Sequence, residues 1–369
     1  MLPMRLINVC GARPNFMKIA PLMRAYQAEP VIEPILVHTG QHYDQKMSHL
    51  FFEELGIPQP DINLEVGSGS HAQQTGLIMQ RFEAVITGHK ADAVLVVGDV
   101  NSTIACALVA AKMGVAVFHV EAGLRSFDRT MPEEINRVLT DAISDLLFVS
   151  EPSGLENLTR EGISADKVHF VGNVMIDTLE RNRRRAESST LLEDLGLPPG
   201  GYGVITMHRP AAVDHPGIMG PLIDAFAEIQ RDLPLVFPVH PRTRARLAET
   251  GLDRRIADLR QLRLIDPVGY LDFLKLMARA AIVLTDSGGI QEETTILGVP
   301  CLTLRENTER PVTITDGTNQ LVGMDPAKLL AAYRQIRHTP PRSAHRPDKW
   351  DGQAAQRIAG IIAHWGRGQ

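Results

Sequence analysis

Cysteine is scarce in this chain of 369 residues, and the three cysteines have no paired spacing. Cys10, Cys106 and Cys301 lie in or beside apolar stretches, which predicts reduced thiols in the core rather than disulfides or metal ligands. No apolar run reaches the roughly 18 residues of a membrane span. The first residues, MLPMRLINVC, also lack the layout of a signal peptide. We therefore expect a soluble, cytoplasmic protein without membrane contact.

Excess positive charge and two common nucleotide-binding motifs are also missing. The formal net charge is −5, and no basic run is present, so the chain is not expected to bind nucleic acid. No Gly-x-x-x-x-Gly-Lys-Ser/Thr loop occurs, which argues against ATP-driven chemistry of that kind. The nearest match to the dinucleotide-binding Gly-x-Gly-x-x-Gly pattern, residues 67–72, does not follow a convincing strand. We interpret it as a loop and expect no redox cofactor.

What is present is a regular alternation of short apolar strands and helices, which predicts an α/β protein with parallel, doubly wound sheets. A chain of 369 residues is longer than most domains with a single hydrophobic core, so we expect two domains, 1–171 and 172–349. An amphipathic helix in 350–369 is expected to pack back on the first domain. The predicted strands are 4–9, 31–37, 93–97, 115–120, 146–149 and 168–171 in the first domain, and 203–206, 235–239, 281–284 and 301–304 in the second.

Polar side chains gather where the strands of the first domain end. Ligands of doubly wound sheets bind outside the carboxyl ends of the strands, so these residues are candidates for a site. They are Arg13, Gln41, His42, Asp99 and Glu121.

A helix start just after the Glu121 loop adds two more candidates. Glu133 and Arg137 are four residues apart and share a helix face, as a routine surface ion pair would. Their place in the chain favours a functional role instead.

The segment 285–311 predicts a nucleotide site in the second domain. Asp286, Ser287, Gly288 and Gly289 follow a strand and open a helix, whose N-terminus attracts anions. A carboxylate one turn later, in the pair 292–293, can accept both hydroxyl groups of a ribose. The cations that follow, Arg305 and Arg310, suit a diphosphate, while His208, Arg209 and His240 end neighbouring strands.

Motifs along the whole chain resemble those of the non-hydrolysing UDP-N-acetylglucosamine 2-epimerases, in order and spacing. They are GARP at 11–14, KIAP at 18–21, TGQH at 39–42, GD at 98–99, HVEAGLRS at 119–126, PEEINR at 132–137, HR at 208–209, PVH at 238–240, DSGGIQEE at 286–293 and TERP at 308–311. The resemblance implies two Rossmann-like domains facing each other across a cleft, as in glycosyltransferase-B enzymes, and a homodimer.

The resemblance also implies the chemistry. UDP is eliminated to give 2-acetamidoglucal, then added back after proton delivery to the other face of C2, without cofactor or metal. The implied catalytic residues are Asp99, Glu121, Glu133 and His208. The implied substrate-binding residues are Arg13, Lys18, Arg137, His240, Phe273, Ser287, Gly288, Gly289, Glu293 and Arg310, with Phe273 against the uracil.

Some positions depart from the family pattern. Asn15 stands where glutamate is frequent, and Pro210-Ala211-Ala212 replaces a common Arg-Glu-Asn. Bacterial members use this region for a second, activating substrate site, for which Gln41, Gln45 and Arg209 are the candidates here.

Four alternatives stay open on sequence alone. The chain could be a hydrolysing epimerase that releases free N-acetylmannosamine, or an epimerase of a related 2,3-diacetamido uronic acid nucleotide. It could also be a glycosyltransferase of the same fold, or a UDP-sugar binding protein without activity.

Overall fold

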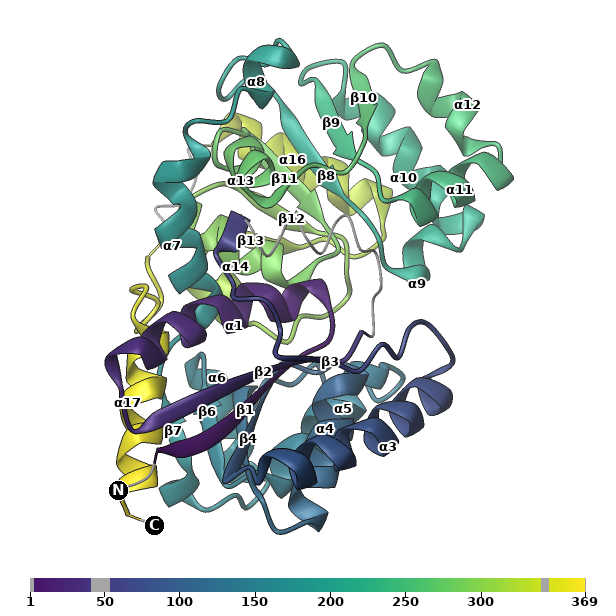
Figure 1. Ribbon diagram of the computed structural model, residues 1–369. Coiled ribbons are helices and arrows are strands. Elements are labelled where there is room, and N and C mark those ends of the chain that lie inside the picture. Colours follow the sequence, from purple (N-terminus) through teal and green to yellow (C-terminus); the bar gives the residue numbers. More distant parts are fainter. Residues whose placement is uncertain (1–2, 41–53, 340–344, 369) are drawn as a thin grey trace. The chain divides into compact units, whose positions relative to one another are not determined.

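The computed structural model describes residues 3–40, 54–339 and 345–368, and the chain forms two compact units (Figure 1). Unit 1 comprises Met1–Arg181 and Asp348–Gln369, and unit 2 comprises Asn182–Pro347. The division lies inside helix α7 (Val174–Ala186), whereas the sequence pattern predicts a boundary near residue 172. The arginine-rich stretch at 181–185 therefore lies inside this helix.

The described part of unit 1 contains a seven-stranded sheet in the order β3-β2-β1-β4-β5-β6-β7, with every neighbouring pair parallel. The strands are β1 (Met4–Cys10), β2 (Ile32–His38), β3 (Ile62–Asn63), β4 (Ala93–Val97), β5 (Ala116–Ala122), β6 (Leu146–Val149) and β7 (Val168–Phe170). Apolar side chains run almost without interruption along β4 and β6, as expected for parallel strands that are covered on both faces.

Helices cover both faces of this sheet. They are α1 (Arg13–Ala25), η1 (Tyr26–Ala28), α3 (His71–His89), α4 (Asn101–Lys112), α5 (Pro132–Ile143), α6 (Pro152–Arg160), η2 (Ala165–Lys167), α7 and α17 (Ala354–Arg367). Ile7 and Val9 of β1 pack in one core cluster with residues of α3 and α4. Asn8, which points to the opposite face, receives a hydrogen bond from Tyr26 at 3.1 Å.

The C-terminal helix α17 belongs to unit 1, where it runs beside α1 (Figure 1). Trp365 contacts Phe118 of β5 edge to face, with ring centroids 5.1 Å apart. The buried Trp350 donates to the carbonyl of Ser150 at 2.8 Å, and Asp177 caps α17 by accepting the backbone N–H groups of Ala354 and Ala355.

The described part of unit 2 contains a six-stranded parallel sheet in the order β10-β9-β8-β11-β12-β13. The strands are β8 (Gly203–Thr206), β9 (Leu235–Pro238), β10 (Leu262–Ile265), β11 (Ile282–Thr285), β12 (Cys301–Thr303) and β13 (Asn319–Leu321). The helices are α8 (Leu191–Asp194), α9 (Pro210–Val213), α10 (Pro216–Ile229), α11 (Pro241–Glu249), α12 (Leu252–Ala257), α13 (Tyr270–Ala278), α14 (Gly288–Leu297), α15 (Val312–Thr315) and α16 (Pro326–His338).

Two separate core clusters show that helices also cover both faces of this sheet. Residues of α10 and α16 pack on one face and residues of α8 and α13 on the other. Both units are thus doubly wound α/β folds, as the sequence predicts. In each, strand order reverses beside the first strand, between β1 and β4 and between β8 and β11. A crevice at the carboxyl ends of the strands is expected at those points.

Among residues 3–40, 54–339 and 345–368, we find no helix whose length and hydrophobicity would suit a membrane span.

Candidate active site

Two candidate acidic residues of unit 1 lie at the carboxyl ends of the neighbouring strands β4 and β5. Asp99 follows β4, and its side chain keeps 28% of its surface exposed. Glu121 lies near the end of β5 and is buried, and its Oε2 accepts a hydrogen bond from Lys18 of α1, which is also buried. A buried carboxylate requires a cation or several donors, so this ion pair accounts for both charges.

The backbone at Glu121 is strained. Its φ of +71° lies in the left-handed region, and the pairing of β5 with β6 shifts register between Val120 and Ala122. Such a conformation costs on the order of 1–3 kcal/mol for a residue with a side chain, and it concentrates at functional sites. Irregular strand ends re-aim side chains in this way. Glycine is favoured at the nearby position 98, because its φ of +67° lies in the left-handed region and a Cβ there would lie 2.9 Å from Lys18 Nζ.

Arg137 links Asp99 to helix α5. Its guanidinium contacts Asp99 Oδ2 at 2.7 Å and Glu134 Oε2 at 2.5 Å, and the residue is buried. Arg137 is therefore not part of an exposed surface pair. Glu133 is half-buried on the same helix turn.

Glu134 is a residue that we did not single out from the sequence. Its carboxylate accepts the backbone N–H groups of Ser126 and Phe127 at 2.9 and 2.8 Å, as well as the Ser126 hydroxyl. It thereby anchors the loop that leads from β5 into α5, in which Phe127 has a φ of +59°. The only feature of the sequence that pointed to Glu134 was its position next to Glu133. The sequence did not show that its carboxylate would accept hydrogen bonds from Ser126 and Phe127.

In unit 2, His208 and Asp286 form a dyad at the carboxyl ends of β8 and β11. His208 Nδ1 lies 2.9 Å from Asp286 Oδ1, and Asp286 Oδ2 accepts the backbone N–H groups of His208 and Arg209. Burial would raise the pKa of Asp286, but the hydrogen bonds and charge of His208 and the hydrogen bond from Arg209 hold this pKa below its usual range. The carboxylate orients the His208 ring, whose side chain is 57% exposed.

The turn from Ser287 to Gly289 opens helix α14, as the sequence predicts. Ser287 is the N-cap residue, and the first helical N–H groups point out of the helix end. A Cβ on Gly288 would lie 2.6 Å from the Arg310 guanidinium. The glycine therefore brings backbone and cation together at one point, which suits an anion such as phosphate.

Arg310 belongs to a buried cluster of charges. It contacts Glu292 through Nε and Glu309 through a terminal nitrogen at 2.7 Å, and Glu309 also pairs with Arg305 at 2.8 Å. Arg209 lies 4.0 Å from Glu309. The carboxylates hold these arginines in fixed orientations, so little side-chain entropy would be lost when an anion binds.

Glu293 is buried one turn into α14 and accepts a hydrogen bond from Tyr270 at 3.0 Å. Burial raises the pKa of Glu293 to about 7; the charge of Glu292 acts in the same direction, and the Tyr270 hydrogen bond acts against it. This carboxyl group consequently changes charge near neutral pH.

The remaining predicted residues lie in different settings. His240 is the N-cap residue of α11, and its Nδ1 accepts the Arg242 N–H at 3.3 Å. Phe273 is half-buried against the core cluster beside α13. Arg13 is the first residue of α1. Gln41, His42 and Gln45 lie outside the described residues, so the second-site prediction stays open.

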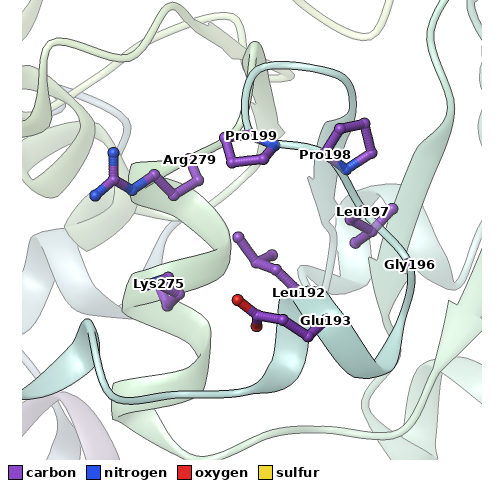
Figure 2. A pocket seen from close by; sticks show the side chains of 8 residues that line it. All are labelled: Leu192, Glu193, Gly196, Leu197, Pro198, Pro199, Lys275 and Arg279. Carbon is purple, nitrogen blue, oxygen red and sulfur yellow. The ribbon is translucent and has the colours of Figure 1, made fainter.

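A pocket of about 620 Å³ lies elsewhere in unit 2 (Figure 2). It is lined by α8, the loop that follows it, and the end of α13. These segments lead into β8 and β11, so the pocket lies toward the amino ends of the strands, away from His208 and Asp286. Its two cations, Lys275 and Arg279, are both paired with Glu187. Within the described ranges, no group of three potential metal ligands occurs.

Comparison with known proteins shows similarity throughout both units. The sequence model of the family described as UDP-N-acetylglucosamine 2-epimerase matches residues 24–363. A protein of that name from Methanocaldococcus jannaschii is 42% identical over 98% of this chain and 99% of its own. A crystal structure of the enzyme from that organism, in complex with UDP-GlcNAc and UDP, has a TM-score of 0.92 at 41% identity and covers 98% of this chain and 100% of that one. A UDP-2,3-diacetamido-2,3-dideoxy-D-glucuronate 2-epimerase from Pseudomonas aeruginosa is 41% identical over 98% of this chain and 99% of its own.

Proposed function

The chain belongs to the UDP-N-acetylglucosamine 2-epimerase family, and from this we propose that it interconverts UDP-N-acetylglucosamine and UDP-N-acetylmannosamine. The observation that carries the proposal is that two of the three candidate carboxylates in unit 1 are paired with a cation. Glu121 contacts Lys18 and Asp99 contacts Arg137, at the ends of adjacent strands. Two oriented carboxylates suit proton transfer to and from opposite faces of one carbon.

The substrate explains why a nucleotide must leave during the reaction. The C2 proton is not beside a carbonyl group, so its removal alone would leave an unstabilised carbanion. If UDP departs from C1 as the proton leaves C2, a C1–C2 double bond forms instead, giving 2-acetamidoglucal. In the reverse step a proton adds to the other face of C2, and UDP adds to C1. The charges balance because UDP takes the electron pair of the broken C1–O bond.

In this proposal, unit 1 supplies the proton transfers. Asp99, Glu121 and Glu133 are the acid and base groups, and Arg137 orients Asp99. Lys18 neutralises Glu121 and, together with Arg13, would counter the charge of the departing diphosphate.

Unit 2 would retain the UDP. The N-terminus of α14, from Ser287 to Gly289, together with Arg310 would bind phosphate oxygens, while Glu293 would accept the ribose hydroxyls. The exposed edge of the His208 ring would donate to the diphosphate, since Asp286 occupies its Nδ1 side. His240 and Phe273 are the remaining candidates for contacts with the nucleotide.

The test is proton NMR of the purified full-length protein with UDP-N-acetylglucosamine in D2O. Elimination and addition should place deuterium at C2 of both epimers, because the abstracted proton exchanges with solvent. An epimer that keeps its C2 proton would exclude the elimination route. Free N-acetylmannosamine would indicate a hydrolysing enzyme, and an unchanged sugar would indicate a binding protein or a glycosyltransferase that requires an acceptor.

A related sugar is a second candidate, because the relative from Pseudomonas aeruginosa acts by name on a diacetamido uronic acid nucleotide. Comparison of kcat/KM for the two nucleotide sugars would decide between them.

We further propose that the protein is a homodimer in a reducing compartment such as the cytoplasm. Helix α5 exposes three large apolar side chains, Ile135, Val138 and Leu139, which suit burial against a second copy. Cys10, Cys106 and Cys301 are free buried thiols, which supports a reducing environment.

A further inference from the structure

We propose that His119 is a buried imidazolium that positions the two strand ends carrying Asp99 and Glu121. The inference rests on the proposed function, because it treats those two carboxylates as the acid and base groups. Its subject is a residue that contacts neither carboxylate directly and that lies in the middle of an apolar strand.

Both ring nitrogens of His119 face hydrogen-bond acceptors. The ring is completely buried; its Nδ1 lies 2.6 Å from Asp141 Oδ1, and its Nε2 lies 2.8 Å from the Gly98 carbonyl oxygen. A carbonyl oxygen only accepts, so Nε2 must carry a proton. A neutral imidazole has one N–H group, and Nδ1 would then face a carboxylate with a lone pair.

The charge state of Asp141 decides where the second proton lies. Burial would raise the pKa of Asp141, but the charge and hydrogen bond of His119, the charge of Arg125 and the N–H of Gly123 lower it below its usual range. Asp141 Oδ2 lies 2.7 Å from Arg125 and 3.0 Å from the Gly123 nitrogen. The contacts of Oδ2 with Arg125 and Gly123 do not depend on His119 and favour an ionised Asp141, so the proton between Asp141 and Nδ1 is assigned to the ring.

One side of the imidazolium holds the turn before Asp99. Gly98 has a φ of +67°, donates its N–H to the Val120 carbonyl at 3.0 Å and accepts from His119. Both backbone polar groups of Gly98, which belong to the two peptide units on either side of its Cα, are thus hydrogen-bonded to β5. The same residue lies against the Lys18–Glu121 pair. Rotation of the Gly98 carbonyl would shift the backbone that carries Asp99.

The Nδ1 side of the ring helps to fix the backbone on both sides of Glu121. His119 and Gly123 stand two residues before and two residues after Glu121, and both donate to the carboxylate of Asp141 on α5. The left-handed conformation at Glu121 is held from both directions by this one carboxylate. Arg125 closes the network through a two-point contact with Glu161, at 2.7 and 2.5 Å.

An asparagine or glutamine side chain cannot supply two divergent N–H donors across this gap. An asparagine or glutamine amide carries both protons on one nitrogen, so it would leave one of the two acceptors without its donor. A buried acceptor that loses its donor is costly, which favours movement of the Gly98 turn. The expected consequence is misplaced carboxylates in a chain that still folds.

The first test measures the protonation of the His119 ring in the wild-type protein and uses a variant only to assign the signals. Nitrogen-15 NMR of the wild-type protein at pH 7 should show one histidine ring with both nitrogens protonated and both N–H protons protected from exchange. The signals are assigned by their loss in His119→Asn. A His119 ring with a single proton at pH 7 would overturn the proposal.

The second test separates positioning from general destabilisation. His119→Asn should lower kcat roughly ten- to a hundredfold, the scale of a small misplacement of catalytic groups, while KM changes by less than about threefold. His169→Asn is the matched control, since it makes the same change in edge strand β7, where the half-buried ring lies near Phe148. It should leave kcat unchanged. A near-wild-type kcat for His119→Asn would contradict the inference.

Chemical rescue gives a readout that a purely structural role would not move. In His119→Ala, added imidazole should raise kcat, because imidazolium supplies two N–H donors. Added 1-methylimidazole should not, because one of its two ring nitrogens is methylated and its cation therefore supplies only one N–H donor. Equal rescue by both would show that two donors are unnecessary and would overturn the proposal. If the wild-type protein forms no epimer at all, the proposed function is wrong. The NMR measurement still tests the protonation of the His119 ring, because it does not depend on activity.

Discussion

At the scale of single residues, Glu293 predicts how nucleotide binding depends on pH. Its pKa is raised to about 7 by burial, and ribose hydroxyls bind the carboxylate form. UDP affinity should therefore rise as pH increases through 7 and fall by up to about tenfold per pH unit well below it. Calorimetry in two buffers of different ionisation enthalpy at pH 7 should detect release of a fraction of a proton on binding.

Two variants isolate this effect from the titration of UDP itself. Glu293→Gln should remove the part of the pH dependence that belongs to the protein and lower affinity at pH 8. Tyr270→Phe removes a donor that favours the charged form, so its midpoint should move to higher pH. Unaltered pH dependence in Glu293→Gln would contradict a ribose-binding role. The same pKa shift has a stability cost: burial of the charged form should lower the free energy of unfolding as pH rises from about 4.5 toward 7.

The paired carboxylates of unit 1 give the sharpest catalytic prediction. Asp99→Asn and Glu121→Gln should each reduce kcat by at least about a hundredfold, since general acid–base groups contribute on the order of 10²–10⁴. UDP affinity should change by less than about threefold, because the groups proposed to bind the phosphates and the ribose most directly, Ser287–Gly289, Arg310 and Glu293, lie in unit 2. Glu83→Gln, the same chemical change on exposed α3, is the control. Near-wild-type turnover in either active-site variant would refute that residue's role.

Individual residues also show where sequence reasoning ends. Asp99 and Glu121 could be predicted because a polar residue directly after an apolar strand has a defined place on the sheet edge. Their partners could not: Lys18 is separated from Glu121 by 103 residues, and only folding brings the two together. His119 and Glu134 were missed because their roles depend on several backbone partners, which no local pattern encodes.

At the scale of elements, the central strands and the edge strand β7 were predictable, whereas three other edge strands were not. The predicted strands at 93–97, 146–149 and 203–206 coincide with β4, β6 and β8. We predicted no strand at β3, β10 or β13, and each of the three lies at the edge of its sheet. Edge strands are short and half-covered, so they lack the apolar run that identifies a central parallel strand.

Helix α14 offers a test of close approach between backbone and cation. Gly288→Ala should weaken UDP binding roughly tenfold, because the new Cβ would lie 2.6 Å from the Arg310 guanidinium, which Glu292 and Glu309 hold in place. Gly217→Ala is a matched control at the second position of α10, where a Cβ meets nothing within 4 Å. It should keep UDP affinity and raise Tm, since alanine favours helix by up to about 1 kcal/mol. UDP affinity is measured by calorimetry. Equal affinities in the two variants would show that UDP binding does not depend on the close approach of Gly288 to Arg310.

At the scale of the whole molecule, helix α5 reverses the usual amphipathic pattern. Its inward residues are charged, with Glu134, Arg137 and Asp141 all buried at spacings of three and four. Its exposed residues are apolar: Ile135, Val138 and Leu139 are 43%, 38% and 51% exposed. A helix of 12 residues is marginal by itself and gains most of its stability from packing. The apolar outer face supports the proposed homodimer, in which a second copy would cover α5.

This arrangement predicts that association and turnover are linked. Leu139→Glu should convert the dimer to a monomer, because a charge would be buried without a partner in the interface. Light scattering after gel filtration would measure the mass. The monomer should also have a lower kcat, since the inner face of α5 holds Arg137 against Asp99 and Asp141 against His119. Gln356→Glu adds the same charge on exposed α17 and should change neither property. A Leu139→Glu monomer with wild-type kcat would show that the two faces of α5 act independently, and a wild-type protein that is already monomeric would remove the premise.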